Sequence, residues 1–264
     1  MNKENITNDK IKEDIISLGI KRGDLLLVHS SLSSIGFVDG GADTVITCLL
    51  EVIGEKGTLL MPAFQGGSEF VILSEMVSGK RDPFDLRTDS SELGKITEVF
   101  RQKKGVVRSI SPTHSTCGIG PLATEIFEGH SQCKITTGLG SPYEKICLLH
   151  GKILLLGVGH GANTTLHFIE NTNGAPTISS VEFNSVVIDM YGKEHAIKCY
   201  SHMPSGLKRD YPKVDSILTE NKIQNSGTIG MADSRLINAF EMMTLVGEKV
   251  RENPLFLINP FKPE

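Results

Sequence analysis

A histidine and a carboxylate three positions apart form the clearest pattern for acid–base chemistry. Both lie in the segment NTTLHFIE, where His167 and Glu170 share one face of a helix. A carboxylate so placed fixes the imidazole tautomer and stabilises its protonated form, as an oriented general base requires. Asn163 and Thr164 add hydrogen-bonding groups in the first turn, where backbone amides favour a developing oxyanion. The other interpretation is a core histidine, a solvated surface charge and a helix cap.

A second polar segment follows an apolar run early in the chain. It comprises His29, Ser30, Ser31, Leu32, Ser33 and Ser34. Hydroxyls and backbone amides beyond the end of a strand can form a cradle for phosphates. The alternative is a serine-rich turn before a helix.

Other chemistry finds less support in the motifs. Imidazole suits zinc, iron and copper, but the eight histidines form no H-x-H, H-x-x-x-H or H-E-x-x-H pattern. We therefore predict no metal site. The chain also has no G-x-S-x-G motif of the kind that carries a serine nucleophile.

The elements that position these residues follow a strand–helix–strand order. Residues 24–31 and 57–62 are short apolar runs typical of buried strands, and apolar residues at helical spacing predict a helix over 42–53. Residues 152–159 form the strongest strand and lead through glycines into the helix start at 163. We predict an α/β fold with a mixed central sheet flanked by helices.

The later part of the chain differs in pattern. Residues 181–198 alternate apolar and polar side chains, which predicts paired antiparallel strands, and a helix is expected over 234–250. Because no linker forces a boundary, residues 1–264 are expected to form a single domain. Residues 175–230 would form a smaller antiparallel β-containing substrate region near the C-terminus, as an insertion or subdomain.

The connection between the second strand and the middle of the chain has no regular period. Residues 65–88 are rich in glycine, serine and charged residues, and predict an irregular loop that serves as a lid or substrate loop. Asp89 or Ser90 would cap a helix that carries Leu93 and Phe100.

Composition excludes several partners. The net charge of -4 and the pI of about 6.1 lack the basic excess that binding to nucleic acid requires. No apolar stretch is long enough to span a membrane and no leader is evident, so we expect a cytoplasmic protein without a membrane partner. Five widely spaced cysteines predict reduced thiols. Antiparallel strands near the end of the chain are compatible with a homodimer.

Several blocks together resemble the aminoglycoside 3-N-acetyltransferase family. In the family's order they are LVHSSLSSIG at 27–36, GTLLMP at 57–62, RS and PTHS within 108–115, GLGSPY at 138–143 and NTTLHFIE at 163–170. The resemblance covers nearly the whole chain. It implies a coenzyme A-dependent transfer of an acyl group to a primary amine of a small-molecule amino sugar.

The resemblance also implies a role for each block. The segment 29–34 would hold the pyrophosphate and pantetheine of acetyl-CoA or another acyl-CoA, with Arg108 and Ser115 as further cofactor contacts. His167 would be the general base, oriented by Glu170, and a hydroxyl or amide at the helix start would stabilise the oxyanion. Transfer would proceed in a ternary complex, without a metal or a covalent acyl-enzyme.

The acceptor is less defined than the donor. Aminoglycosides are polycations that call for an acidic cleft, whereas the stretch from Lys208 to Lys213 is mixed and leans basic. This favours a second hypothesis, a nucleotide-linked amino sugar of surface polysaccharide biosynthesis. Its pyrophosphate would pair with Lys208, Arg209 or Lys213, with Asp210 as a further substrate contact. The alternative is that these side chains belong to a solvated turn and bind no substrate.

Two hypotheses from other classes remain open beside the acyltransferase. One is a metal-dependent hydrolase, since histidines and carboxylates are abundant. The other is a non-catalytic module that binds coenzyme A or a nucleotide, in which His167 is structural.

Overall fold

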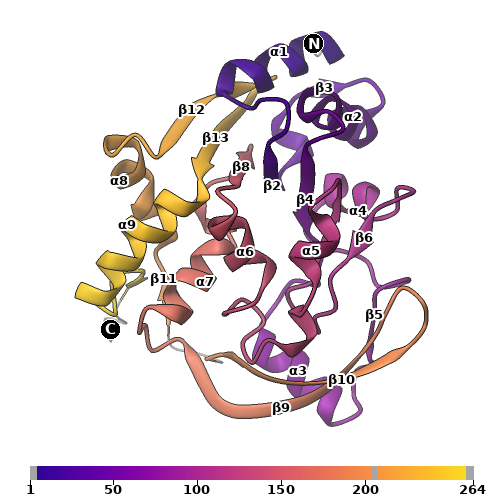
Figure 1. Ribbon diagram of the computed structural model, residues 1–264, viewed down its shortest axis with the longest axis vertical. Coiled ribbons are helices and arrows are strands. Elements are labelled where there is room, and N and C mark those ends of the chain that lie inside the picture. Colours follow the sequence, from indigo (N-terminus) through magenta and orange to yellow (C-terminus); the bar gives the residue numbers. More distant parts are fainter. Residues whose placement is uncertain (1–4, 204–206, 260–264) are drawn as a thin grey trace.

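A mixed sheet forms the centre of the protein (Figure 1), a computed structural model that describes residues 5–203 and 207–259. Among these residues the sheet has seven strands. In spatial order they are β12 (Gln224–Ile229), β13 (Ala232–Asn238), β8 (Lys152–Leu156), β2 (Leu25–Ser30), β4 (Thr58–Pro62), β7 (Thr116–Ile119) and β6 (Val107–Arg108). Strand β2 is parallel to β4 and β8, and the other pairs are antiparallel. The predicted α/β class is confirmed.

Helices cover both faces of this sheet. On β2, Leu26 and Val28 pack into one hydrophobic cluster, whereas Leu25 and Leu27 pack into the other. The first cluster includes α1 (Asn8–Leu18), α2 (Gly41–Ile53) and α4 (Lys95–Arg101); the second includes α5 (Ala123–Phe127), α6 (Pro142–Leu148), α7 (Thr165–Thr172), α8 (Val214–Glu220) and α9 (Ala239–Glu252). Strands buried on both faces have continuous apolar sequences, which explains why these runs are recognisable in the sequence.

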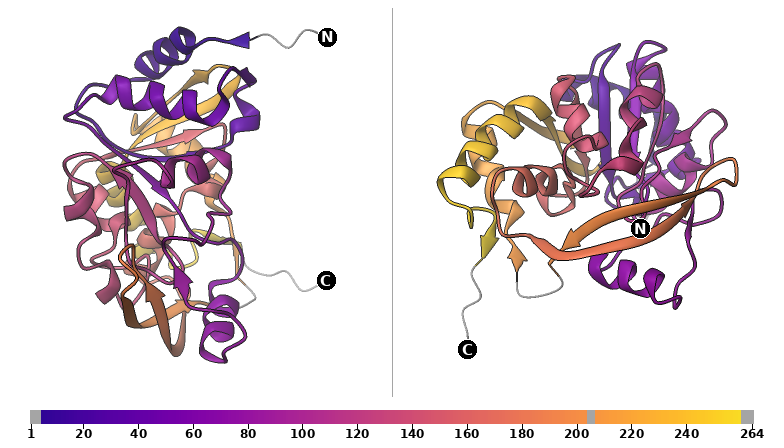
Figure 2. Two further views of the ribbon diagram at one scale, coloured as in Figure 1. Left: turned by 90° about the vertical axis from the view of Figure 1, so that its right-hand side faces the viewer. Right: turned by 60° about the horizontal axis from the view of Figure 1, so that its bottom comes forward.

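A second, smaller sheet lies outside the central one. It consists of the antiparallel hairpin β9 (Ile178–Ile188) and β10 (Glu194–His202), with β5 (Phe84–Asp85) parallel to β9. Figure 2 shows the hairpin lying across one end of the molecule beside α3 (Glu69–Val77). Leu73, Phe84 and Phe183 belong to a third hydrophobic cluster that joins α3 to this sheet. The predicted pair of antiparallel strands is confirmed.

Short strand pairs complete the fold. They are β1 (Asn5–Ile6) with β3 (Phe37–Val38), and β11 (Lys208–Arg209) with β14 (Ile258–Asn259). None of the described helices is both long and apolar enough to cross a membrane. The five cysteines are buried free thiols, as their spacing predicted.

Three element boundaries differ from the sequence-based expectations. The helix expected over 234–250 begins at Ala239, because residues 234–238 pair with β8 as part of β13. Residues 224–229 likewise belong to the central sheet, so the part of 175–230 outside that sheet is chiefly the β9–β10 hairpin. The helix expected after Asp89 or Ser90 begins at Lys95, and Gly94 occupies its N-cap.

The segment 65–88 is also more ordered than expected. It contains α3, whose buried face carries Ile72 and Leu73, and the short strand β5. Gly66, Gly67 and Ser68 before this helix gave the segment its loop-like composition. The helix brings Glu69 into the interior, where the residue is 6% exposed.

Several buried histidines make the fold sensitive to acid. Burial lowers the pKa of His29 to about 3 and that of His130 to about 4, from an ordinary value of 6.5. As the pH falls below 6.5 the unfolded chain binds protons at these positions while the folded chain does not. Each such histidine is therefore expected to lower the free energy of unfolding by about 1.4 kcal/mol per pH unit.

Urea unfolding between about pH 6.5 and about pH 5 measures this effect in a range where carboxylates contribute little. A His130→Gln variant serves as the matched control, and its slope should be shallower by about one proton. A stability that stays constant over this range would show that the buried histidines bind protons in the folded state.

Candidate active site

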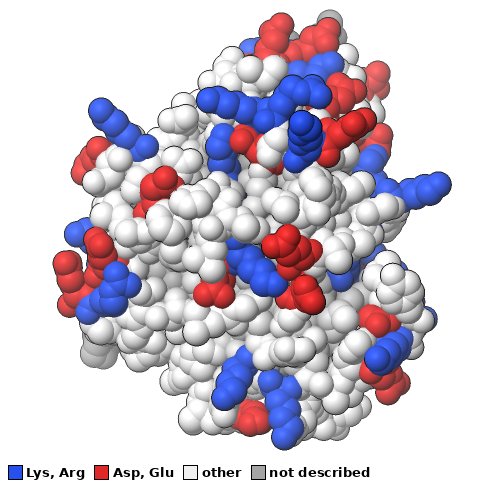
Figure 3. All heavy atoms as spheres, in the orientation of Figure 1, with Lys and Arg blue, Asp and Glu red and all other residues white. Residues whose placement is uncertain are grey.

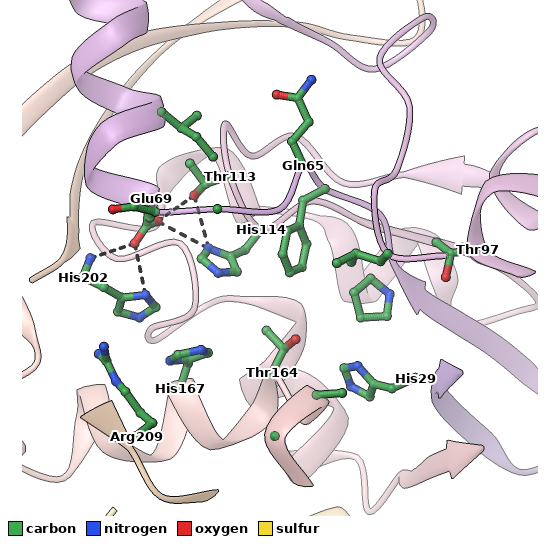
Figure 4. Close-up of a pocket in the computed structure, with 18 of the residues that line it drawn as sticks. His29, Gln65, Glu69, Thr97, Thr113, His114, Thr164, His167, His202 and Arg209 are labelled. Atoms are coloured by element: carbon green, nitrogen blue, oxygen red, sulfur yellow. Dashed lines mark hydrogen bonds and ion pairs between the residues drawn. The ribbon is translucent and has the colours of Figure 1, made fainter. Parts of the chain in front are cut away.

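A cavity of about 550 Å³ opens where the parallel strands end. His29 and Ser30 at the end of β2 and Pro62 at the end of β4 contribute to its wall, as do residues of the loop between β8 and α7. The crevice beyond the carboxyl ends of parallel strands is the usual ligand site of an α/β sheet. Figure 4 shows Glu69, Thr113 and His114 on one side of this cavity and Arg209, His167 and Thr164 on the other.

His167 and Glu170 are placed as their spacing predicted. Nδ1 of His167 lies 2.9 Å from Oε1 of Glu170, which is buried beneath it. A carboxylate only accepts hydrogen bonds, so Nδ1 carries the proton and Nε2 is the basic nitrogen. Nε2 forms no hydrogen bond within the described part of the chain, and His167 lines the cavity. The pair is an oriented base that faces a binding site.

Two residues distant in sequence complete this arrangement. Arg209 donates hydrogen bonds to Glu170, the shortest being 3.0 Å from Nη2 to Oε1. The hydroxyl oxygen of Tyr211 lies 2.7 Å from Nδ1 of His167. Tyr211 was not identified from the sequence, and Arg209 was assigned to the substrate, because neither is spaced regularly from His167. In the structure they hold the histidine and its carboxylate.

Burial and charge set the protonation of the pair. Burial lowers the pKa of His167 below its ordinary value, although the hydrogen bond to Glu170 acts in the opposite direction. Burial alone would raise the pKa of Glu170, but the hydrogen bond from His167 and the charge of Arg209 bring it below the ordinary value. At neutral pH the imidazole is therefore neutral and the carboxylate charged, as a general base requires.

A second histidine lies directly on His167. The two rings of His202 and His167 are stacked, with centroids 4.3 Å apart and planes 27° apart. Nε2 of His202 accepts a hydrogen bond of 3.0 Å from the Asn171 amide, and Nδ1 lies 3.4 Å from Oε2 of Glu69. Burial lowers the pKa of His202 well below its ordinary value. The stacked partner is thus a neutral imidazole fixed on both nitrogens.

Glu69 is held by donors on every side. Its Oε1 accepts hydrogen bonds of 2.6 Å from the hydroxyls of Thr113 and Thr136, and its Oε2 accepts one of 2.8 Å from the His202 backbone amide. Burial would raise the pKa of Glu69, but the nearby His114 and His202 and the hydrogen bond from Thr113 bring it below its ordinary value. Sequence reasoning missed this carboxylate because its segment was assigned to a loop.

The predicted site residues Thr164 and Asn163, which precede α7, lie in different surroundings. Thr164 lines the cavity, and its hydroxyl is free to meet a ligand there. Asn163 is buried outside the cavity wall, where its Oδ1 accepts from the Thr165 amide and its Nδ2 contacts Met242 Sδ. The structure therefore favours the capping interpretation for Asn163 over the catalytic one.

The residues of the segment 29–34 also differ in what they contact. Nε2 of His29 and Oγ of Ser30 are buried without a hydrogen-bond partner in the described chain, and both residues line the cavity. Ser31, Leu32 and Ser33 line an adjoining, more open groove that meets the cavity at Ser30. Ser34 donates to the Gly157 carbonyl instead and so ties this turn to the end of β8.

Arg108 and Ser115 lie away from the cavity wall. The Arg108 guanidinium donates to the carbonyls of Ala63, Leu86 and Asp89, and its Nε donates to Oγ of Ser115 at 3.2 Å. Burial lowers the pKa of Arg108 to about 10. All these donors bind the protein itself, so the geometry favours a structural role over the expected cofactor contact.

The basic stretch at 208–213 contributes one side chain to the cavity. Arg209 lines it but is paired with Glu170. Lys208 is exposed, Asp210 is bonded through its backbone amide to Leu257, and Lys213 donates to the Phe256 carbonyl. The expectation that these residues gather around a substrate pyrophosphate is therefore not supported by their placement.

One group of side chains in the described chain has metal-ligand geometry. Ligand atoms of His167, Glu170 and His202 lie within 4.8 Å of one another. The Glu170 carboxylate already accepts from Arg209, so a cation there would lie beside a guanidinium. Nδ1 of His167 and both nitrogens of His202 are also in use. This chemistry fits an acid–base site better than a metal site.

Comparison with known proteins identifies the family that the chain matches. A family model described as aminoglycoside 3-N-acetyltransferase matches residues 27–250. The curated aminoglycoside N(3)-acetyltransferase III of Acinetobacter baumannii is 34% identical over 198 residues, which cover 71% of this chain and 68% of the relative.

Solved structures share the fold. A mutant of aminoglycoside acetyltransferase AAC(3)-IVa in complex with a gentamicin has 27% identity and a TM-score of 0.82, covering 98% of this chain and 94% of its own. A binary complex of AAC-IIIb with CoASH has a TM-score of 0.83, covering 98% of this chain and 100% of its own. At 22% identity the latter shows the fold alone.

Proposed function

The chain belongs to the aminoglycoside 3-N-acetyltransferase family, and on this premise we propose that it transfers an acyl group from acyl-CoA to a primary amine of an amino sugar. The observation that carries the proposal is the His167–Glu170 pair, whose free imidazole nitrogen faces the cavity. An alkyl amine is mostly protonated at neutral pH and therefore not nucleophilic. A neutral imidazole held at the cavity wall supplies the base that the reaction needs.

The proposed transfer is a single substitution at the thioester. The amine nitrogen attacks the carbonyl carbon, and Nε2 of His167 takes a proton from that nitrogen. The hydroxyl of Thr164 stabilises the oxyanion that forms. The C–S bond then breaks, and the sulfur takes the proton from the His167 imidazolium and leaves as the coenzyme thiol. The neutral imidazole is restored, and an amide remains on the sugar. Glu170 stabilises the imidazolium throughout.

The cavity offers a fitting place for the coenzyme. The unsatisfied Nε2 of His29 and Oγ of Ser30 are buried polar atoms that a pantetheine amide would satisfy. The groove along Ser31 and Ser33 continues outward from the same point and provides hydroxyls for the rest of the coenzyme. Coenzyme A is also the ligand named for AAC-IIIb, which shares the fold.

The basic test is the release of free thiol. Purified protein mixed with acetyl-CoA and an amino sugar is expected to release one coenzyme thiol for each acylated amine found by mass spectrometry. Acetyl-CoA alone should release almost none. If no amine stimulated thiol release from acetyl-CoA or a longer acyl-CoA, the proposed activity would be wrong, and a non-catalytic binding module would replace it.

A second prediction is that the acyl group passes directly from coenzyme A to the amine, without a covalent acyl-enzyme. All five cysteines are buried, and burial raises the pKa of the thiols, to about 12 for Cys117 and Cys199 and to about 11 for Cys133. None of the five lines the cavity. Such thiols are poor nucleophiles. The intact mass of the protein incubated with acetyl-CoA alone should therefore show no acyl adduct, whereas a stoichiometric adduct on one residue would demonstrate a covalent intermediate.

A further inference from the structure

We propose that the acceptor is a sugar with a single amino group, either free or linked to a nucleotide, and not a polycationic aminoglycoside. This inference rests on the proposed acyl transfer and narrows its substrate. It follows from the charges that the cavity presents.

The described residues that line the cavity offer no carboxylate for a second ammonium group. Among the described residues that line it, Glu69 is the one acidic residue. Both of its oxygens are occupied by the hydroxyls of Thr113 and Thr136 and by the backbone amide of His202. With 6% of its surface exposed, Glu69 is part of the wall rather than a partner for a ligand.

The remaining charge in the cavity is positive. Arg209 lines the wall with 19% of its side chain exposed, and its counterion Glu170 is completely buried behind it. Burial keeps the pKa values of His29, His167 and His202 below the ordinary value, so these rings add no negative charge and stay neutral. A second or third ammonium group would meet a guanidinium or neutral groups, and would lose hydration without gaining a counterion.

The other polar groups suit a neutral sugar ring. Gln65, Ser68 and Thr97 line the cavity with amide and hydroxyl groups, which are partners for sugar hydroxyls. Glu92 is not among these lining residues, and its Oε2 accepts a hydrogen bond from the Gly66 amide. It therefore supplies no carboxylate to the cavity wall.

The face of the molecule that Figure 3 shows carries no large acidic patch. Acidic and basic side chains alternate there in small mixed groups, and no large patch of one sign is visible. Electrostatic steering of a polycation requires a patch of negative charge. The interior and this face therefore both lack the charge that such a ligand needs.

The test compares acceptors by their number of amino groups. Glucosamine and UDP-glucosamine carry one amine, whereas gentamicin carries several, and all are assayed with the same acyl-CoA by thiol release. The kcat/KM for the better monoamine is expected to exceed that for gentamicin by at least about tenfold. The ratio between glucosamine and UDP-glucosamine identifies whether the sugar is free or nucleotide-linked. A preference for gentamicin would overturn the inference but leave acyl transfer intact, whereas no transfer to any amine would overturn the proposed function.

A charge variant tests the physical reason directly. Ser68 is exposed at the cavity wall and occupies the N-cap of α3 without a side-chain cap bond. Ser68→Asp supplies the missing carboxylate, and Ser68→Asn is its neutral match. With Asp, kcat/KM for gentamicin should rise about threefold or more over the Asn variant, and the gain should disappear in high salt. Equal values for the two variants would contradict the inference that charge excludes the polycation.

Discussion

His167→Ala is expected to lower kcat for acyl transfer by about 10²- to 10⁴-fold, the usual contribution of a general base. This variant lacks the imidazole that Glu170 orients, and the neighbouring His202 is a poor substitute because both of its ring nitrogens are committed to Glu69 and Asn171. Steady-state thiol release at saturating acyl-CoA and amine measures the loss.

Two further measurements, the affinity for coenzyme A and the rescue of activity by free imidazole, distinguish this loss of catalysis from a structural effect. The affinity for coenzyme A, measured by calorimetry, should stay within a few-fold of the wild type, since His167 is assigned to proton transfer. Free imidazole added to the variant should restore part of the rate, because the truncated side chain leaves space beside the cavity. A variant that keeps most of its kcat would show that another group is the base.

Glu170→Gln is expected to lower kcat by roughly 10²-fold, although the amide has the same shape as the carboxylate. The amide oxygen still accepts from Nδ1 of His167, so the ring keeps its orientation. The negative charge that stabilises the imidazolium is lost, however, and only the step that forms this cation is impaired. Kinetics should therefore show a lower kcat with little change in the KM values.

The neighbouring Arg209 provides the control for this variant. Removing the charge of Glu170 leaves the guanidinium of Arg209 without its counterion, which by itself destabilises the fold. In the double variant Glu170→Gln and Arg209→Met the thermal stability should recover, while kcat should remain low. If kcat recovered together with stability, Glu170 would act through the fold alone.

Features that depend on residues close together in the chain could be predicted from the sequence alone. The strands β2, β4 and β8 are buried on both faces and therefore appear as unbroken apolar runs, and α2 shows a regular helical period. His167 and Glu170 were found because they are three residues apart on α7 and interact within one turn. Such local relations follow directly from helix and strand geometry.

The part of the site that the sequence did not predict depends on contacts between segments that are distant in the sequence. Glu69 receives its hydrogen bonds from residues 44, 67 and 133 positions away, and Arg209 reaches Glu170 across 39 positions. No period or motif in one sequence encodes such pairs. The same reason explains β13, whose residues 234–238 carry a helix-like pattern but pair with β8.

The two walls of the cavity now have separate roles. The wall around His167 carries the base, its carboxylate and Arg209. Glu69 on the other wall holds the stacked His202 in place, and burial keeps the pKa of His202 well below its ordinary value although the charge of Glu69 acts in the opposite direction. A protonated His202 would oppose the imidazolium that forms on His167 during transfer. Burial of His202 therefore keeps the surroundings of the base in the protonation state that catalysis needs.

The pH dependence of kcat is the most direct measure of the central claim that His167 accepts the proton. In the wild type, kcat should fall on the acid side with an apparent pKa below 6.5, since burial lowers the pKa of His167. The residual rate of His167→Ala should lack this acid limb. An acid limb with the same midpoint in both proteins would contradict the claim.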